Sequence, residues 1–305
     1  MKLKTLLLIV LVFFILRTIS SPYARATTTR ARTKTLAAGT TSGTWMIVDV
    51  TGGNVAIYNK TATPTITLLP TKIPIYPGLS YNKCLTIRNM FILSGAGITK
   101  ILTVNPTTQT WTLKDGPIAG TYAFGDDPWE SVMGDTLISY GGNTTTYIPA
   151  SGTTPESWSP YTQGPPFSTN PWVIWTSTMG NMAIGVPNKV SVYQNGVWSP
   201  AQAGPHIVGN DWWTLSIGST LIGAKGTTST YTAGTGGAYG TWSTPTQALP
   251  PLTSGDYWGC VVDNMVISVK GKICQQNADG SFSAVTTLSM PTVSGAHWDG
   301  VMKLN

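Results

Sequence analysis

Few residues in this sequence of 305 amino acids could carry acid–base, nucleophilic or metal chemistry. There are two histidines (His206 and His297), two glutamates (Glu130 and Glu156) and three cysteines. A glycosidase needs two carboxylates on either side of one bond, and the two glutamates are expected on different strands. The spacings CxxC, HExxH, GxSxG and the phosphate-binding loop are all absent. The sequence therefore predicts no catalytic residues, no metal ligands and no cofactor.

Tryptophan is the residue type whose spacing could serve binding. Five tryptophans recur at intervals of 43, 41, 45 and 40 residues: Trp129, Trp172, Trp213, Trp258 and Trp298. An aromatic ring can stack on a sugar ring, so these residues could form the rim of a carbohydrate site. The alternative is that they fill the spaces between structural units. The sequence leaves both interpretations open.

Two further markers keep the same period. A second aromatic series steps by 47, 40, 44 and 40 residues (Trp111, Trp158, Trp198, Trp242 and Phe282), and a proline closes each unit. Within a unit, short runs of Val, Ile, Thr and aromatic residues are separated by Gly, Asn, Asp and Pro, which is typical of strands and hairpins. Four such strands in 40 to 50 residues predict the blade of a β-propeller. The second aromatic series is expected on outer strands, packed between neighbouring blades.

The first and last segments of the repeat region together make up one blade. The first unit, residues 44–69, supplies a second, third and fourth strand but no first, whereas residues 297–304 form a first strand with nothing after it. Their pairing would close the ring and remove an open edge. Only 10% of the residues are charged and there are 33 glycines and 21 prolines, which excludes a helical bundle. The sequence therefore predicts an all-β, six-bladed propeller of four-stranded antiparallel blades over residues 44–305.

One unit carries a known type of repeat. Leu137-Ile-Ser-Tyr-Gly-Gly142, followed by Thr146-Tyr147 and Trp158, resembles the kelch repeat. The resemblance implies a kelch-like propeller and does not transfer a function. Kelch-type propellers include secreted copper-radical oxidases, which need two histidines, tyrosine ligands and a Tyr–Cys crosslink. Cys84 is available for such a crosslink, but the two histidines fall on different blades.

The N-terminus has the features of a secretory signal. Lys2 and Lys4 precede an unbroken apolar run, Leu6–Leu16, and Ala24-Arg25-Ala26 offers a cleavage site. We predict a signal peptide over residues 1–26, cleaved after Ala26, and a Thr-rich leader over residues 27–43; an uncleaved membrane anchor is the alternative. From Thr35 onward there are 11 basic and 12 acidic residues, so the body has no electrostatic basis for binding nucleic acid.

Cysteines and glycosylation motifs complete the candidate sites. Cys260 and Cys274 are expected on the first and third strands of the last blade, roughly 9–10 Å apart, which is beyond the reach of a disulfide. Asn59-Lys-Thr61 and Asn143-Thr-Thr145 are N-glycosylation sequons. Both are predicted on exposed hairpin turns.

These observations favour a secreted, non-enzymatic propeller that acts as a binding or structural module and interacts with a protein or glycan surface. An extracellular or virion-surface assembly is one setting that fits. The alternatives are a lectin that uses the inner tryptophans and, third, a secreted copper-radical oxidase or hydrolase.

Overall fold

The computed structural model describes most residues between 42 and 304. It does not describe residues 1–41, 75–82, 96–97, 106–107, 109, 118–120, 123–124, 127–128, 140–141, 168–175, 186–188, 206–213, 236–238 and 305. The chain divides into two units, Met1–Ala37 and Ala38–Asn305. The predicted signal peptide and nearly all of the predicted leader lie outside the described residues, and the fold below is that of the second unit.

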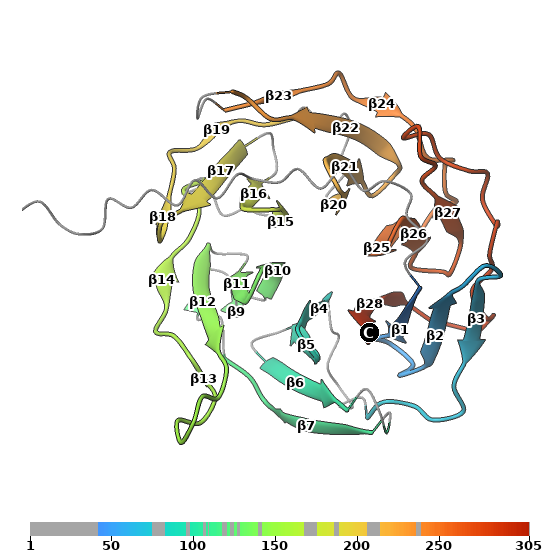
Figure 1. Ribbon diagram of the computed structural model, residues 1–305, viewed down its shortest axis with the longest axis horizontal. Helices are drawn as coiled ribbons and strands as arrows, with labels where there is room; N and C mark the ends of the chain where they lie inside the picture. The colour runs from blue at the N-terminus through green and yellow to red at the C-terminus, as the bar shows by residue number, and fades with distance from the viewer. Residues whose placement is uncertain are drawn as a thin grey trace, which may run out of the picture. The chain divides into compact units, whose positions relative to one another are not determined.

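Six small antiparallel sheets stand around a central axis, as Figure 1 shows. The inner strands, in ring order, are β28 (Trp298–Lys303), β4 (Lys83–Ile87), β10 (Trp129–Met133), β15 (Thr176–Met179), β20 (Thr214–Ile217) and β25 (Trp258–Val262). The second strands are β1 (Gly43–Asp49), β5 (Met90–Gly95), β11 (Thr136–Ser139), β16 (Met182–Gly185), β21 (Thr220–Gly223) and β26 (Met265–Ser268). The third strands are β2 (Val55–Lys60), β6 (Ile98–Val104), β12 (Asn143–Ile148), β17 (Lys189–Gln194), β22 (Thr227–Thr232) and β27 (Ile273–Gln275). We number the blades 1 to 6 in this order, and the predicted all-β, six-bladed propeller is confirmed.

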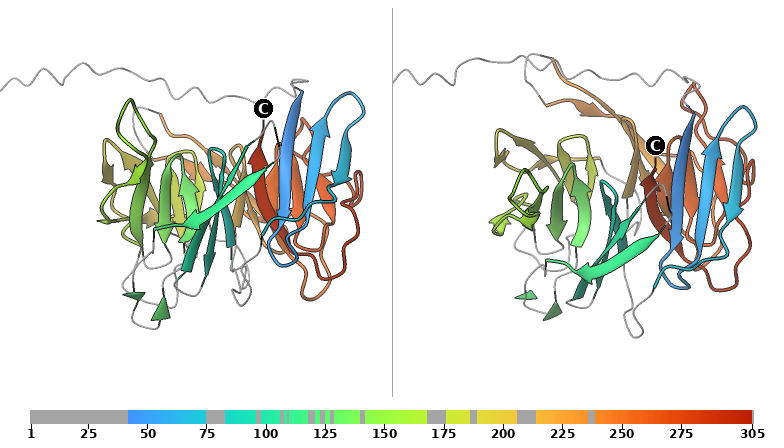
Figure 2. Two further views of the ribbon diagram at one scale, coloured as in Figure 1. Left: turned by 90° about the horizontal axis from the view of Figure 1, so that it is seen from below. Right: turned by 60° about the horizontal axis from the view of Figure 1, so that its bottom comes forward.

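The C-terminal strand closes the ring as the sequence predicted. Strand β28 pairs antiparallel with β1, with Trp45 opposite Lys303 and Met46 opposite Met302. In Figures 1 and 2 the red β28 lies beside the blue β1. Blade 1 is therefore built from both ends of the second unit. Strand β1 begins at Gly43, one residue earlier than the predicted body.

The outer strands differ between blades. They are continuous in blade 1, β3 (Thr65–Leu68), and in blade 2, β7 (Trp111–Asp115). In blades 3, 4 and 5 each is split into two short pieces that pair with the same third strand. The pieces are β13 (Ser157–Trp158) and β14 (Thr162–Gln163), β18 (Val197–Trp198) and β19 (Gln202–Ala203), and β23 (Thr241–Trp242) and β24 (Thr246–Gln247). A further hairpin, β8 (Thr121–Tyr122) with β9 (Gly125–Asp126), precedes blade 3.

A serine that follows the outer aromatic residue explains the split. In blade 4 the Oγ of Ser199 accepts a bond from the amide of Val192 at 3.0 Å and donates to the carbonyl of Pro200 at 3.2 Å. Since the hydroxyl replaces one partner of the ladder, the strand can break there without leaving that amide unbonded. The same pair of bonds recurs in three other blades, at Ser159, Ser243 and Ser283. Blade 2 has Thr112 after its tryptophan, and its outer strand is continuous.

Blade 6 departs from the predicted four strands. Its sheet contains β25, β26 and β27, and the fourth segment is held by an isolated bridge between Gln276 and Phe282. The amides of Ser283 and Thr286 still donate to the carbonyls of Gln275 and Ile273. Thr286 has a φ of 81°, which an extended strand does not accommodate, so the segment cannot continue as a strand.

The core lies between neighbouring sheets. On β1, Met46 and Val48 pack with Phe91 of blade 2, while Ile47 packs with Met265 of blade 6. Successive side chains of a strand point to opposite faces, so one strand contributes to two apolar layers. Blades stacked in this way bury both faces of their sheets.

The outer tryptophans lie where the sequence placed them. Each described one is half-buried and belongs to an apolar cluster shared with the preceding blade. In blades 3 to 5 the ring also faces a tyrosine on the third strand of its own blade, with centroids 4.9 to 5.3 Å apart: Tyr147–Trp158, Tyr193–Trp198 and Tyr231–Trp242. These pairs tie the outer strand to the sheet.

Candidate functional site

A β-bulge follows the inner tryptophan in three blades. The register of β10 shifts between Trp129 and Ser131, and that of β25 shifts between Trp258 and Cys260. On β1, consecutive residues Val48 and Asp49 pair with Gly300 and Trp298 of β28. A bulge inserts one extra residue, and the residues inserted here are Glu130, Gly259 and Asp299. All three line a cavity on the axis of the ring.

The bulge also decides where the tryptophans lie. Trp129 and Trp258 are 0% exposed and Trp298 is 1% exposed, each within an apolar cluster between blades. The prediction that these three rings form an accessible rim is wrong, because a ring enclosed by side chains offers no face to a sugar. Trp172 and Trp213 lie outside the described residues.

The central cavity has a volume of about 350 Å³ and is lined by the inner strands of all six blades. Its polar lining includes two carboxylates, Glu130 and Asp299, and two thiols, Cys84 and Cys260. Hydroxyl groups of four strands and of one loop complete it: Thr86, Ser131, Ser177, Thr178, Ser216 and Tyr257. No lysine or arginine is among the described residues that line the cavity. The charged groups that line it, within the described chain, are therefore acidic.

Three of these hydroxyls join neighbouring inner strands. Thr178 of blade 4 donates from Oγ1 to the carbonyl of Val132 in blade 3 at 2.5 Å. Ser216 of blade 5 donates in turn to the carbonyl of Thr178 at 2.9 Å, and Thr86 of blade 2 donates to Val301 of blade 1. Each hydroxyl proton is used in a bond to a carbonyl, so the oxygen can act toward a ligand only as a hydrogen-bond acceptor.

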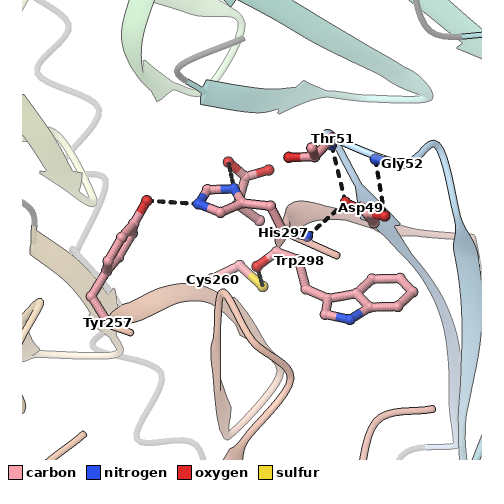
Figure 3. Close-up of polar contacts among 8 residues, drawn as sticks. Asp49, Thr51, Gly52, Tyr257, Cys260, His297 and Trp298 are labelled. Carbon is pink, nitrogen blue, oxygen red and sulfur yellow. Dashed lines mark hydrogen bonds and ion pairs between the residues drawn. The ribbon is translucent and has the colours of Figure 1, made fainter. Parts of the chain in front are cut away.

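A polar chain stands at one end of the cavity, where β25 and β28 begin (Figure 3). The Oη of Tyr257 lies 2.7 Å from Nε2 of His297, and Nδ1 of His297 lies 3.7 Å from Oδ2 of Asp299. A carboxylate beside Nδ1 favours the proton on that nitrogen, so Nε2 accepts the bond from the tyrosine hydroxyl. Burial lowers the pKa of His297, with the charge of Asp49 partly opposing it. Burial, reinforced by the charges of Asp299 and Asp256, raises the pKa of Tyr257 to about 12.

Asp49, at the end of β1, fixes the position of His297. Its buried carboxylate accepts bonds from the amides of Thr51 and Gly52, at 3.0 and 3.1 Å, and from the side-chain amide of Asn54. It also accepts the backbone amide of His297 at 2.6 Å (Figure 3). The segment that leads into the closing strand is thus fastened to the turn of blade 1.

Two thiols flank the closing strand. Cys260 donates from Sγ to the carbonyl of Trp298 at 3.7 Å. Cys84 lies against Gly300, so closely that a Cβ at that position would be only 2.5 Å from its Sγ. Burial raises the pKa of both thiols well above the usual value, and the charge of Asp299 adds to the effect. All three cysteines are free. Cys260 and Cys274 lie on β25 and β27 with β26 between them, which is the placement that the sequence predicted.

The remaining candidates are scattered. Glu156 lies on the outside of blade 3, bonded to Lys114 and to the hydroxyl of Tyr147, so it does not join Glu130 in the cavity. His206 lies outside the described residues. Within the described chain, no group of three or more His, Cys, Asp or Glu residues could hold a metal ion, and no helix is long and apolar enough to cross a membrane.

Both sequon asparagines lie in strands and are half-buried, so their predicted place on hairpin turns is wrong. Asn59 is in β2, and its Oδ1 accepts a bond from Thr44 at 3.1 Å. Asn143 opens β12 opposite Gln163. Asn59 forms the last pair of β2 with β3, opposite Thr65, and Asn143 forms the first pair of β12 with β14, so each asparagine stands at the end of a strand pairing.

Tyr257 and His297 are the residues that the sequence interpretation underrated. They occupy the same place in the repeat, one residue before an inner tryptophan, and neither was among the predicted site residues. A polar residue at that place in two neighbouring blades was the available signal.

Comparison with known proteins supports the fold. A comparison with models of protein families gave no match, nor did a comparison with curated proteins. Two solved structures that carry the name "putative 6-phosphogluconolactonase" are similar, one from Bacteroides uniformis and one from Bacteroides fragilis. The first is 10% identical, covers 86% of this chain and 99% of its own, and has a TM-score of 0.52. The second is 9% identical, covers 87% and 98%, and also has a TM-score of 0.52. Neither carries a kelch name, so the kelch resemblance stays a prediction.

Proposed function

We propose that this protein is a secreted, non-enzymatic β-propeller that binds a glycan or protein surface around the mouth of its central channel. The observation that carries the proposal is the acidic, hydroxyl-rich cavity to which all six blades contribute. Binding sites of this kind are concave, largely preformed and furnished with a few convergent polar groups. Secretion rests on the basic, apolar and small-residue pattern of residues 1–26.

The protonation states favour binding over catalysis. A thiol or a phenol reacts as its anion, and the raised pKa values of Cys84, Cys260 and Tyr257 keep all three protonated. Nε2 of His297 already accepts the bond from Tyr257, which leaves the carboxylates of Glu130 and Asp299 as the bases of the described site. These groups can therefore orient a ligand but have little nucleophilic character.

The competing enzymatic candidate is a lactonase, which the names of the two similar solved structures suggest. A 6-phosphogluconolactone carries a phosphate, which proteins hold with arginine, lysine or backbone amides. The described lining of this channel carries Glu130 and Asp299 instead. Like charges repel in a cavity of low dielectric, so we expect no hydrolysis of this substrate above the uncatalysed rate.

A pair of arginine variants tests the proposal. Val132→Arg introduces a long cation at a residue that lines the cavity and also packs against the apolar cluster between blades 2 and 3. Val197→Arg makes the same change on an outer strand, where the valine is 67% exposed. The purified protein would be screened on a glycan array and, by chemical cross-linking, on extracellular protein extracts. We expect Val132→Arg to lose the captured partner and Val197→Arg to retain it. Retention by both folded variants would show that the channel mouth is not the binding surface.

A further inference from the structure

We propose that the central cavity takes a small ligand that carries a primary ammonium group together with hydroxyl groups, as an amino sugar does. This inference rests on the proposed binding function and names the ligand class of that site.

The first element is the position of the carboxylates. Glu130 and Asp299 are the extra residues of two equivalent bulges, in blades 3 and 1. Glu130 is 2% exposed, and the side chain of Asp299 is 8% exposed. The bulges therefore place two buried acidic side chains in the lining of the cavity. Since a bulge is a built feature of a sheet, this placement is part of the fold.

The second element is independent of these charges and comes from the hydroxyls. Thr86, Thr178 and Ser216 each donate their proton to a carbonyl of the neighbouring blade. What these oxygens can still offer is the role of acceptor. A carboxylate has roughly four lone-pair positions, so Glu130 and Asp299 can accept from a ligand in addition to their contacts within the chain. The described lining is thus richer in acceptors than in donors.

The third element is the electrostatic environment. The charge of Asp299 reaches Tyr257, Cys84 and Cys260, whose pKa values it raises. No lysine or arginine in the described lining offsets it. A cationic donor would be held by charge-assisted bonds, which are the stronger class of hydrogen bond. Hydroxyl groups would donate to the remaining acceptors.

Size sets the upper limit of the ligand. A cavity of about 350 Å³ is at the lower end of the range for small-molecule pockets. One sugar ring fits such a volume, whereas a folded chain does not. The ligand class is therefore a single amino sugar or the terminal residue of a glycan.

Titration calorimetry with three related sugars tests the ligand class. Glucosamine carries the ammonium group, glucose lacks nitrogen, and N-acetylglucosamine has the nitrogen in an uncharged amide. We expect glucosamine to bind at least about tenfold more tightly than the other two, the typical effect of one charge-assisted bond. Equal affinities for the three sugars, or no heat of binding from glucosamine, would overturn the proposal.

Neutral isosteres locate the site. Glu130→Gln and Asp299→Asn should each weaken glucosamine binding about tenfold. Asp115→Asn, on a side chain that is 84% exposed on the outer strand of blade 2, is the matched control and should leave it unchanged. Should Asp299→Asn fail to fold, Glu130→Gln alone decides. If Glu130→Gln or Asp299→Asn folds but binds glucosamine with unchanged affinity, that carboxylate does not belong to the binding site.

The two proposals fail in different ways. If glucosamine does not bind while Val132→Arg still abolishes partner capture, the ligand class is wrong and the binding function stands. If Glu130→Gln weakens glucosamine binding but neither arginine variant affects partner capture, the cavity site stands and the binding surface lies elsewhere.

Discussion

The hydroxyl of Tyr257 lies 2.7 Å from Nε2 of His297, although 40 residues separate the two. Both residues stand immediately before an inner tryptophan, one in blade 6 and the other in blade 1. The bond therefore joins equivalent places of the repeat in neighbouring blades, and the backbone of His297 is in turn bonded to Asp49, at the end of the β28–β1 pairing that closes the ring. Because it also borders the channel, one contact links closure of the ring to the geometry of the candidate site.

His297 should make stability depend on pH below neutrality. Its pKa is lowered in the folded state, so the unfolded chain, with a histidine pKa of about 6.5, takes up the proton first. The stabilising contribution is complete above about pH 6.5 and is lost as the pH falls below it. We expect the midpoint of urea unfolding to decrease between pH 7 and pH 5.

A variant of this histidine provides the test. His297→Gln should flatten the decrease. If the folded variant retains the full pH dependence, His297 is not its source.

Asp49 should be necessary for closure of the ring. Asp49→Ala leaves the amides of Thr51, Gly52 and His297 without their acceptor, and buried donors without partners are costly. We expect a loss of about 3 kcal/mol in the free energy of unfolding, measured by denaturant titration. The control is Asp279→Ala, which changes an exposed aspartate whose carboxylate accepts bonds from Ser281. This variant should change the free energy of unfolding by less than about 0.5 kcal/mol. Equal effects would mean that the carboxylate of Asp49 is not necessary for closure of the ring.

The two tryptophan series should differ in their effect on stability. Trp258→Ala empties a fully buried site and should cost roughly 3–5 kcal/mol. Trp158→Ala removes a ring that is only partly buried and should cost clearly less, because less apolar area is lost from burial. Thermal or denaturant unfolding measures both. A larger loss from the outer variant would contradict the burial of the inner ring.

The serine at the break of an outer strand should contribute a measurable bond. Ser199→Ala removes both the acceptor for Val192 and the donor to Pro200, and we expect a loss of about 1 kcal/mol. The same change at Ser159 and Ser243 lies in other blades, so the three losses should add. A triple variant with the stability of the parent chain would show that the hydroxyls are replaceable by water.

The sequence by itself determined the number of blades and the way the ring closes. The aromatic markers recur once per blade because each blade buries the same layer against its neighbour, and the missing first strand of blade 1 is visible at the opposite end of the chain. The positions of Cys260 and Cys274 follow from the same strand order. These properties depend on spacing along the chain, which a sequence displays directly.

Only the tertiary structure decided which residues face the axis. Regular alternation along the strand gives no reason why Trp129 is buried and Glu130 lines the cavity. The bulge causes this arrangement, and no residue type in the sequence marks where a bulge will form. Likewise, Tyr257 and His297 meet only because blades 6 and 1 are adjacent in space. A candidate site built from inserted residues and from contacts between neighbouring blades depends on the register between strands, and that register is fixed when the whole ring packs.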